Sequence, residues 1–191
     1  AKIKVHGITA AAHKFHGPKG AGALFIKSPL LPDPIIFGGG HENERRAGTE
    51  NLPAIIGFTE ACERFLKTPV FDQKKLKPLT DDLIQFIDSL DRVTFRGSRS
   101  LRLNNTVAFT VAGADSIALL AGLDMEGVCA SSGSACSAGS LEPSHVILAL
   151  GVEKNSANSL VRFSLGRDTT LEEIAAVKMI LPVVINRVRK G

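Results

Sequence analysis

Apolar residues at three- and four-residue spacing predict two long helices. The first covers about residues 72–90, and its apolar face contains Leu79, Leu83, Phe86, Ile87 and Leu90. The second begins at Thr169 or Thr170, because each has a glutamate three residues on that can complete a capping box. Its apolar face contains Leu171, Ile174, Val177, Leu181, Val184 and Val188. Pro182 lies within this helix and is expected to kink it.

Shorter apolar runs between Gly- and Pro-rich turns predict strands and further helices. Strands are expected near residues 3–9, 22–27, 106–111 and 159–165, with another ending near Ala130. Further helices are expected over about residues 53–66, 115–123 and 143–150. Strands separated by helices predict an α/β or α+β layered architecture.

A change of pattern between about residues 67 and 72 predicts a domain boundary. Residues 1–69 are interpreted as the tail of one domain, and residues 70–191 as a compact domain large enough to have its own core. The chain starts with Ala1 rather than Met and opens inside a predicted strand. We therefore expect a fragment or a processed chain.

Composition argues against several classes of protein. The chain has 191 residues, of which 44% are hydrophobic, so it can bury a core. Its formal net charge of +4 is spread along the chain, and it has no Tyr or Trp to stack on bases, so nucleic-acid binding is not expected. We see no charged leader with a cleavage site, and the apolar stretches are too short to cross a bilayer, so membrane insertion is not expected either.

The cysteines and histidines give no metal or disulfide pattern. Cys62, Cys129 and Cys136 include no CxxC pair, which argues against a disulfide framework and against a zinc site, and favours a reducing, cytoplasmic location. Cys62 and Cys129 stand beside apolar residues and are interpreted as inert core residues. His16 and His41 have no carboxylate or cysteine at ligand spacing, so we expect them to form hydrogen bonds in loops.

A turn rich in Gly and Pro follows the first predicted strand and contains a lysine. Residues 12–22 read Ala-His-Lys-Phe-His-Gly-Pro-Lys-Gly-Ala-Gly. Lys14 lies there between apolar runs and would be partly desolvated, which favours the neutral amine that a Schiff base requires. The glycines would allow the backbone to approach a ligand closely. A solvated lysine without a catalytic role is the alternative.

A second candidate is a segment of small residues. Residues 131–140 are all Ser, Gly, Ala or Cys. Because such residues bury little side-chain area, we expect a mobile loop that exposes Cys136. The helix that Pro143 opens would follow, and its N-terminal dipole would favour the thiolate. A free surface cysteine in a linker is an equal alternative.

Four motifs occur in a fixed order along the chain. They are His13-Lys14 with its glycine-rich turn, residues 38–51, residues 131–144 around Cys136, and residues 162–167. In this order they resemble the cysteine desulfurase family over nearly the whole chain, and the cysteine segment resembles the longer form of the branch that supplies iron–sulfur cluster assembly. The resemblance implies an α/β fold of the fold type I pyridoxal-phosphate enzymes. Residues 1–69 would end the large cofactor-binding domain, and residues 70–191 would form the small α+β C-terminal domain.

The resemblance also implies a role for five residues. Lys14 matches the lysine that binds pyridoxal 5'-phosphate, and His13 matches a residue that contacts its phosphate. Thr49 matches a hydroxyl that reaches the phosphate from the partner subunit, although it could instead cap the following helix. Arg162 matches the arginine that binds the substrate carboxylate, although an arginine on a strand could simply pair with a carboxylate. Cys136 matches the nucleophile that takes the sulfur of L-cysteine as a persulfide and leaves L-alanine.

The family is further characterised by a homodimer and a sulfur-acceptor scaffold protein, which the resemblance therefore implies as partners.

Two positions depart from the family pattern: Ala11 stands where a phosphate-binding serine is common, and Asn43 replaces a frequent arginine. The N-terminal half of the family, with the Asp that faces the pyridine nitrogen, is missing from this sequence. We therefore expect these residues alone to be inactive.

Two alternatives stay open at this point. The first is another fold type I enzyme, either an aminotransferase or a selenocysteine lyase. An aminotransferase would have no need for a mobile thiol. A non-catalytic sulfur-relay or dimerising module would have no need for Lys14.

Overall fold

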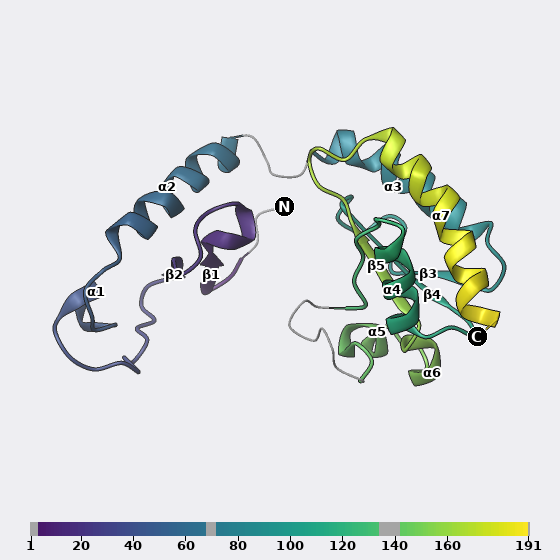
Figure 1. Ribbon diagram of the computed structural model, residues 1–191. Coiled ribbons are helices and arrows are strands. Elements are labelled where there is room, and N and C mark those ends of the chain that lie inside the picture. Colours follow the sequence, from purple (N-terminus) through teal and green to yellow (C-terminus); the bar gives the residue numbers. More distant parts are fainter. Residues whose placement is uncertain (1–3, 68–71, 134–141, 191) are drawn as a thin grey trace. The chain divides into compact units, whose positions relative to one another are not determined.

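The computed structural model describes residues 4–67, 72–133 and 142–190 (Figure 1). The chain divides into two compact units, Ala1–Val70 and Phe71–Gly191. Each unit is described by itself below.

The first unit contains a two-stranded sheet and one long helix. Strand β1 (Gly7–Ala11) pairs antiparallel with β2 (Gly22–Ile26). A 3-10 helix, η1 (Ala12–Phe15), connects them, and a short helical segment, α1 (His41–Glu44), lies in the loop that follows β2. Helix α2 (Leu52–Lys67) packs against η1, where the rings of Phe15 and Phe58 lie 5.5 Å apart.

Large apolar side chains of this unit are mostly exposed. Its buried hydrophobic residues, among those described, are all alanines: Ala12, Ala47, Ala54 and Ala61. Its exposed large hydrophobic residues are Val5, Ile8, Leu24, Phe25, Leu30, Leu31, Ile35, Ile36, Phe37, Leu52, Ile55 and Ile56. Exposed apolar surface on this scale marks a contact surface, because alanine methyl groups contribute little to a hydrophobic core.

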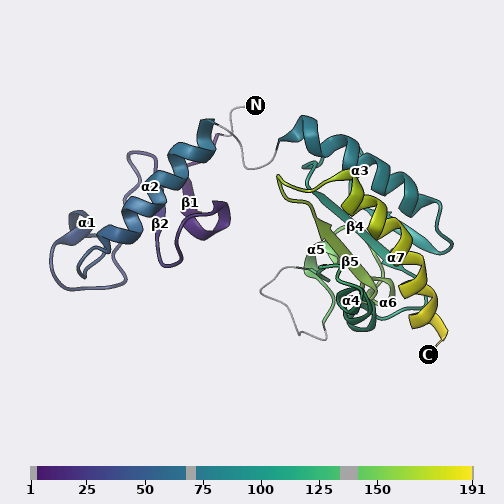
Figure 2. The same cartoon turned by 45° about the horizontal axis from the view of Figure 1, so that its top comes forward.

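The second unit is built on a three-stranded antiparallel sheet in the order β3-β4-β5. The strands are β3 (Val93–Arg96), β4 (Thr106–Val111) and β5 (Leu160–Ser164). Helices α3 (Gln73–Asp88) and α7 (Leu171–Lys190) lie side by side on one face of the sheet (Figure 2). Alternate residues of each strand point toward these helices, as the two-residue period of a strand requires.

The core of the second unit lies between the sheet and these helices. It includes Leu76, Leu83, Ile87, Val107, Phe109, Val111, Val161, Phe163, Leu181 and Val184. Helix α4 (Ser116–Met125) packs against α7 at Gly122, where an added Cβ would lie 2.8 Å from Val184 Cγ1. This position therefore requires glycine for the two helices to approach so closely.

A smaller cluster covers part of the opposite face of the sheet. Helices α5 (His145–Ala149) and α6 (Lys154–Ala157) contribute to it, and its apolar side chains are Ile147, Val152, Ala157, Leu160 and the partly buried Ala108. None of the helices in the described residues is both long and apolar enough to span a membrane.

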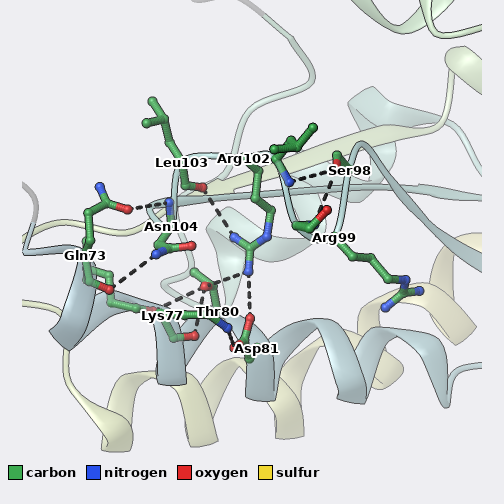
Figure 3. Close-up of polar contacts among 12 residues, drawn as sticks. Gln73, Lys77, Thr80, Asp81, Ser98, Arg99, Arg102, Leu103 and Asn104 are labelled. Carbon is green, nitrogen blue, oxygen red and sulfur yellow. Dashed lines mark hydrogen bonds and ion pairs between the residues drawn. The ribbon is translucent and has the colours of Figure 1, made fainter. Parts of the chain in front are cut away.

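A polar network attaches the connection between β3 and β4 to helix α3 (Figure 3). The guanidinium of Arg102 donates to Asp81 Oδ1 at 2.9 Å, to Thr80 Oγ1 at 3.1 Å and to the carbonyl of Leu103 at 3.3 Å. Asn104 N donates to Gln73 Oε1 at 3.1 Å at the start of the same helix. Arg99 pairs with Asp88 at the end of α3, at 2.8 and 2.9 Å, so the connection is held at three points along this helix.

Most of the predicted elements form close to their expected positions, and the exceptions are specific. The capping box is confirmed at Thr170, whose N–H donates to Glu173 Oε2 at 2.9 Å while its Oγ1 accepts from Glu173 N at 3.3 Å. Helix α7 runs through Pro182 to Lys190. The first strand begins at Gly7, later than expected, and the strand predicted to end near Ala130 is absent from the described residues, where Ser131 forms an isolated bridge to Arg162.

Candidate functional site

The turn that carries Lys14 is held by backbone hydrogen bonds. Ala12 N donates to Ala21 O at 3.0 Å, which continues the β1–β2 ladder by one residue. Gly17 N donates to Ala12 O at 2.9 Å and closes the turn. An added Cβ on Gly17 would lie 2.8 Å from Ala12 Cβ, so the turn needs glycine there. Lys14 therefore projects from a fixed backbone.

Helix α2 supports the same turn from one side. Phe15 packs on Phe58, the ring of His16 lies 5.1 Å from that of Phe65, and an added Cβ on Gly57 would lie 3.0 Å from Pro18 Cγ. His16 thus contacts an aromatic ring, whereas the sequence predicted a hydrogen-bonding role. The apolar contacts of η1 leave His13 and Lys14 on its other side.

His13 and Lys14 are both exposed. The desolvation expected for Lys14 is therefore not provided by the described residues of this unit, because α2 covers only the side of the turn that Phe15 occupies. The amine is accessible and lies beside a histidine, a suitable arrangement for an anionic cofactor that carries an aldehyde.

The loop of residues 38–51 has an unusual backbone. Glu42, Asn43 and Glu44 have positive φ angles of 54°, 55° and 62°. Left-handed backbone at consecutive residues other than glycine costs free energy and persists only where the surroundings hold it, which is common in ligand-binding loops. In the same loop His41 Nδ1 is buried without a partner among the described residues, so the hydrogen bond expected for His41 is not seen at that atom.

Thr49 is exposed in this loop and does not cap helix α2. The capping interaction comes from Asn51, whose Oδ1 accepts from Ala54 N at 3.2 Å. The capping interpretation of Thr49 was therefore wrong by two residues, and its hydroxyl stays available for a ligand.

Arg162 lies on β5 in the second unit, on the face turned away from α3 and α7. Its neighbours Val161 and Phe163 point into the core, so the alternate position of Arg162 faces the other way. Its Nε atom is buried without a hydrogen-bond partner, and it forms no ion pair with a carboxylate of the described residues. A simple pairing role for Arg162 is therefore not supported, and the unused donor favours an anionic ligand.

The segment that contains Cys136 begins next to Arg162. Ser131 N donates to Arg162 O at 3.1 Å, and Arg162 N donates to Ser131 O at 2.6 Å. Cys136 itself lies outside the described residues. The helix expected to begin at Pro143 begins at His145 and has five residues, with Ser144 at its N-cap.

Residues on both sides of this segment line one small cavity. Ser132, Gly133, Glu142, Pro143 and Ser144 contribute to it together with the start of α4, and its volume is about 90 Å³. This volume is well below the roughly 300–1,000 Å³ of a typical cofactor pocket, so the described residues around this cavity do not by themselves form one.

Cys129 and Cys62 differ from their predicted burial. Cys129 is exposed and Cys62 is half-buried. The interpretation of Cys129 as a core residue was wrong because it depended on its apolar neighbour Val128, which is itself only half-buried. Among the described residues, no group of three or more His, Cys, Asp or Glu side chains is placed to hold a metal ion.

Sequence reasoning missed strand β3, which carries Arg96, and the backbone bridge between Ser131 and Arg162. The strand that carries Arg96 has only four residues and gives too short an alternation to be recognised. Ser131 acts through its backbone, for which a sequence carries no signal.

Comparison with known proteins identifies the family. The aminotransferase class-V family matches residues 1–177. The chain belongs to the aminotransferase class-V family. Among curated members, the cysteine desulfurase IscS of Dictyoglomus turgidum is 40% identical over 189 residues, which are 98% of this chain and 48% of that protein. The cysteine desulfurase of Rhodobacter capsulatus is 39% identical and covers 99% of this chain and 49% of its own length.

The fold is also shared with a solved structure of the family. The NifS-like protein of Rickettsia africae superposes with a TM-score of 0.84 at 31% identity, over 95% of this chain and 48% of that one. The predicted fold class, α/β of the fold type I group, is confirmed by this similarity. The chain spans about half the length of the curated relatives that it matches.

Proposed function

We propose that this chain is the C-terminal half of a cysteine desulfurase, which converts L-cysteine to L-alanine and keeps the sulfur as a persulfide on Cys136. The observation that carries the proposal is 40% identity to a curated cysteine desulfurase along 98% of the chain. The names of these relatives favour this reaction over an aminotransferase or a selenocysteine lyase. Homodimer formation, a scaffold protein as sulfur acceptor and a cytoplasmic location stay predictions.

Pyridoxal phosphate fits the residues of the first unit. Lys14 is exposed on a fixed turn, His13 lies beside it, and Thr49 is exposed in a loop with left-handed backbone. In the proposal, Lys14 holds the aldehyde carbon, His13 contacts the phosphate, and Thr49 binds the phosphate of the partner subunit. When bound, the cofactor would supply an electron sink for the bonds at the substrate α- and β-carbons.

The second unit supplies the groups that act on the substrate. Arg162 would bind the α-carboxylate through its guanidinium, whose Nε has no partner among the described residues and whose planar shape matches a carboxylate. The Cys136 thiolate would attack the substrate sulfur, forming an S–S bond as the C–S bond breaks. The electron pair of the broken bond stays with the substrate carbon, and a proton returned there, with Lys14 as the donor, gives alanine.

The first unit also supports the need for a missing half. The described residues of the unit do not pack over its exposed large apolar side chains, and its buried apolar residues are alanines. A folded N-terminal half that covers this surface would also desolvate Lys14, which the described residues leave exposed.

The test combines this chain with the N-terminal half of a relative and pyridoxal phosphate. We expect sulfide and alanine to form from L-cysteine in the presence of a thiol reductant, and a visible absorbance band that depends on Lys14. The Cys136→Ala variant should lose sulfide release, whereas Cys129→Ala, which removes an exposed thiol outside the motif, should keep it. Full turnover by Cys136→Ala would contradict the persulfide mechanism.

A further inference from the structure

Helix α7 has an apolar side that faces away from its own core. Its buried residues pack in the core of the second unit, and they include Ile174, Leu181, Val184 and Ile185. On the opposite side, residues at four-residue spacing are exposed, namely Leu171, Ala175, Met179 and Val183. The side chains of Leu171, Met179 and Val183 are 65%, 71% and 54% exposed. Residues four apart are neighbours on a helix surface, so these four form one apolar stripe along α7.

The middle of this helix is apolar on all sides. In residues 174–185, Lys178 is the only polar residue. Its Nζ atom donates to both carboxylate oxygens of Asp82 on α3, at 2.8 and 3.0 Å, and lies 5.6 Å from the centre of the Phe86 ring. Lys178 is therefore directed toward α3 and does not interrupt the stripe. A helix that is apolar all round is normally covered on all sides, so the stripe indicates a partner that the described residues of the second unit do not supply.

The charges at the two ends of α7 suit a second copy of the same helix that runs in the opposite direction. Glu172 and Glu173 are exposed in its first turn. Near its other end lies Arg187, whose side chain is 52% exposed although it also contacts Glu126. In an antiparallel pair the acidic start of each helix meets the basic end of the other, and the helix dipoles also oppose one another. A parallel pair would instead bring the glutamates of both copies together.

We propose that this stripe is a self-association surface, on which two copies of the chain pack α7 against α7 in antiparallel direction about a two-fold axis at Met179. The small Ala175 lets the two helices approach, and the flexible Met179 side chains fill the centre of the contact. Glu172 and Asn186 are each seven residues, or about two turns, from Met179, so Glu172 of one copy lies beside Asn186 of the other.

This contact is separate from the dimer contact expected for Thr49. Thr49 belongs to the first unit and α7 to the second. The self-association of α7 therefore does not depend on the proposed function, and none of its tests involves cysteine or pyridoxal phosphate. Because each copy contributes only three large apolar side chains, the association is weak and depends on concentration.

The chain has two methionines, Met125 and Met179, so NMR of methionine methyl groups observes the proposed contact together with an internal reference. Met125 is 81% exposed at the end of α4. When the concentration of the labelled full chain is raised, the Met179 methyl signal should shift and broaden, whereas that of Met125 should stay unchanged. In a mixture of labelled and unlabelled copies, the Met179 methyl group should show nuclear Overhauser effects to the second copy.

Variants measured by analytical ultracentrifugation test the surface and its direction. Met179→Glu should weaken self-association at least about tenfold, because it places two like charges together at the axis. Met125→Glu adds the same charge at another exposed methionine and should leave the association unchanged. Asn186→Lys should strengthen it, because the new ammonium lies beside Glu172 of the other copy, and Glu172→Lys should weaken it.

Three results would overturn the proposal. The first is a Met179 signal that does not change with concentration, and the second is an association that Met179→Glu does not weaken. The third is a Met179 signal that shifts only when the N-terminal half of a relative is added, since that half would then cover the stripe. An association that Asn186→Lys weakens would overturn the antiparallel arrangement.

Discussion

Arg102 is the most deeply placed charged residue of the network in Figure 3, since its side chain is only 11% exposed. Asp81 is its carboxylate partner, and Asp81 is itself 45% exposed. Removing the partner would leave a largely buried cation with two neutral acceptors, Thr80 and the carbonyl of Leu103. The stability of the second unit therefore depends on Asp81 more than its own exposure suggests.

We predict that Asp81→Asn lowers the free energy of unfolding by about 1–2 kcal/mol, the usual cost of leaving one charged partner poorly compensated. Urea denaturation followed by circular dichroism measures the difference. Asp91→Asn is the matched control, because its ion pair with Arg92 is exposed on both sides and should contribute little. A loss no larger than that of the control would show that Arg102 does not need its carboxylate.

The same carboxylate predicts a dependence on pH. The hydrogen bond from the Lys77 ammonium, together with the charges of Lys77 and Arg102, lowers the pKa of Asp81 below its ordinary value of 3.8. A carboxyl whose pKa is lower in the folded state stabilises the fold above its unfolded pKa, and this contribution disappears as the pH falls through its folded pKa. The difference between the parent chain and Asp81→Asn should therefore be constant at neutral pH and shrink below about pH 4. A difference that does not change between neutral pH and pH 3 would contradict this.

At the scale of elements, the start of α7 is defined by its capping box. Thr170 and Glu173 each accept a hydrogen bond from the other's backbone N–H. These bonds satisfy donors that a helix start otherwise leaves unpaired. Since α7 covers the sheet with Leu181 and Val184, a frayed start would loosen its contact with the core.

Replacing Thr170 by Ala should destabilise the chain by about 1 kcal/mol, the typical effect of losing an N-cap side chain. Thermal unfolding should show the loss, and amide hydrogen exchange should show faster opening in the first turn of α7. Asn186→Ala on the exposed side of the same helix should cause no such loss, because alanine is the better helix former there. Equal stability of the Thr170→Ala chain would mean that packing alone fixes the start of α7.

Helices and strands were predictable from the sequence where a long repeat or an end signal was present. The apolar repeat of α3 and the capping residues of α7 are of this kind, as is the run of β-branched and apolar residues in β4. β3 was missed because four residues carry almost no periodicity. The short apolar run before Ser131 suggested a strand ending near Ala130, but a strand needs a partner, and among the described residues of this run and its end only Ser131 forms a bridge. Such pairings depend on residues distant in the sequence, so a local pattern cannot specify them.

The candidate site was predictable only in part for a related reason. The Lys14 turn has its own glycine and proline signals, and these led to the right local structure. The exposure of Lys14 was not predictable, because the burial of a side chain depends on what packs over the turn. Likewise, the unpaired Nε of Arg162 follows from the absence of a carboxylate across the sheet, which only the strand register reveals.

At the scale of the whole molecule, the two units differ in how they can be stable. The second unit has a core of large buried side chains, of which Phe109, Leu83 and Leu181 are at most 1% exposed. The first has a two-stranded sheet, which is marginal in water on its own, and its buried apolar residues are alanines. Burial of large apolar side chains is the main favourable contribution to folding, so the units should behave differently when separated.

We predict that residues 72–191, expressed alone, unfold cooperatively, whereas residues 1–71 alone do not. The fragment of residues 72–191 keeps the whole of its main core. Within it, Leu83→Ala should lower the free energy of unfolding by about 2–5 kcal/mol, as expected for a large-to-small change at a fully buried site. In the fragment of residues 1–71 the side chains of Ile35 and Phe37 are 89% and 80% exposed. This fragment should therefore bind a hydrophobic dye and give poorly dispersed NMR spectra. Adding the N-terminal half of a relative should abolish dye binding if that half covers this surface. A sharp, dye-free thermal transition of residues 1–71 alone would instead mean that the first unit is stable without any partner, and the argument for a missing half from its exposed apolar residues would fail.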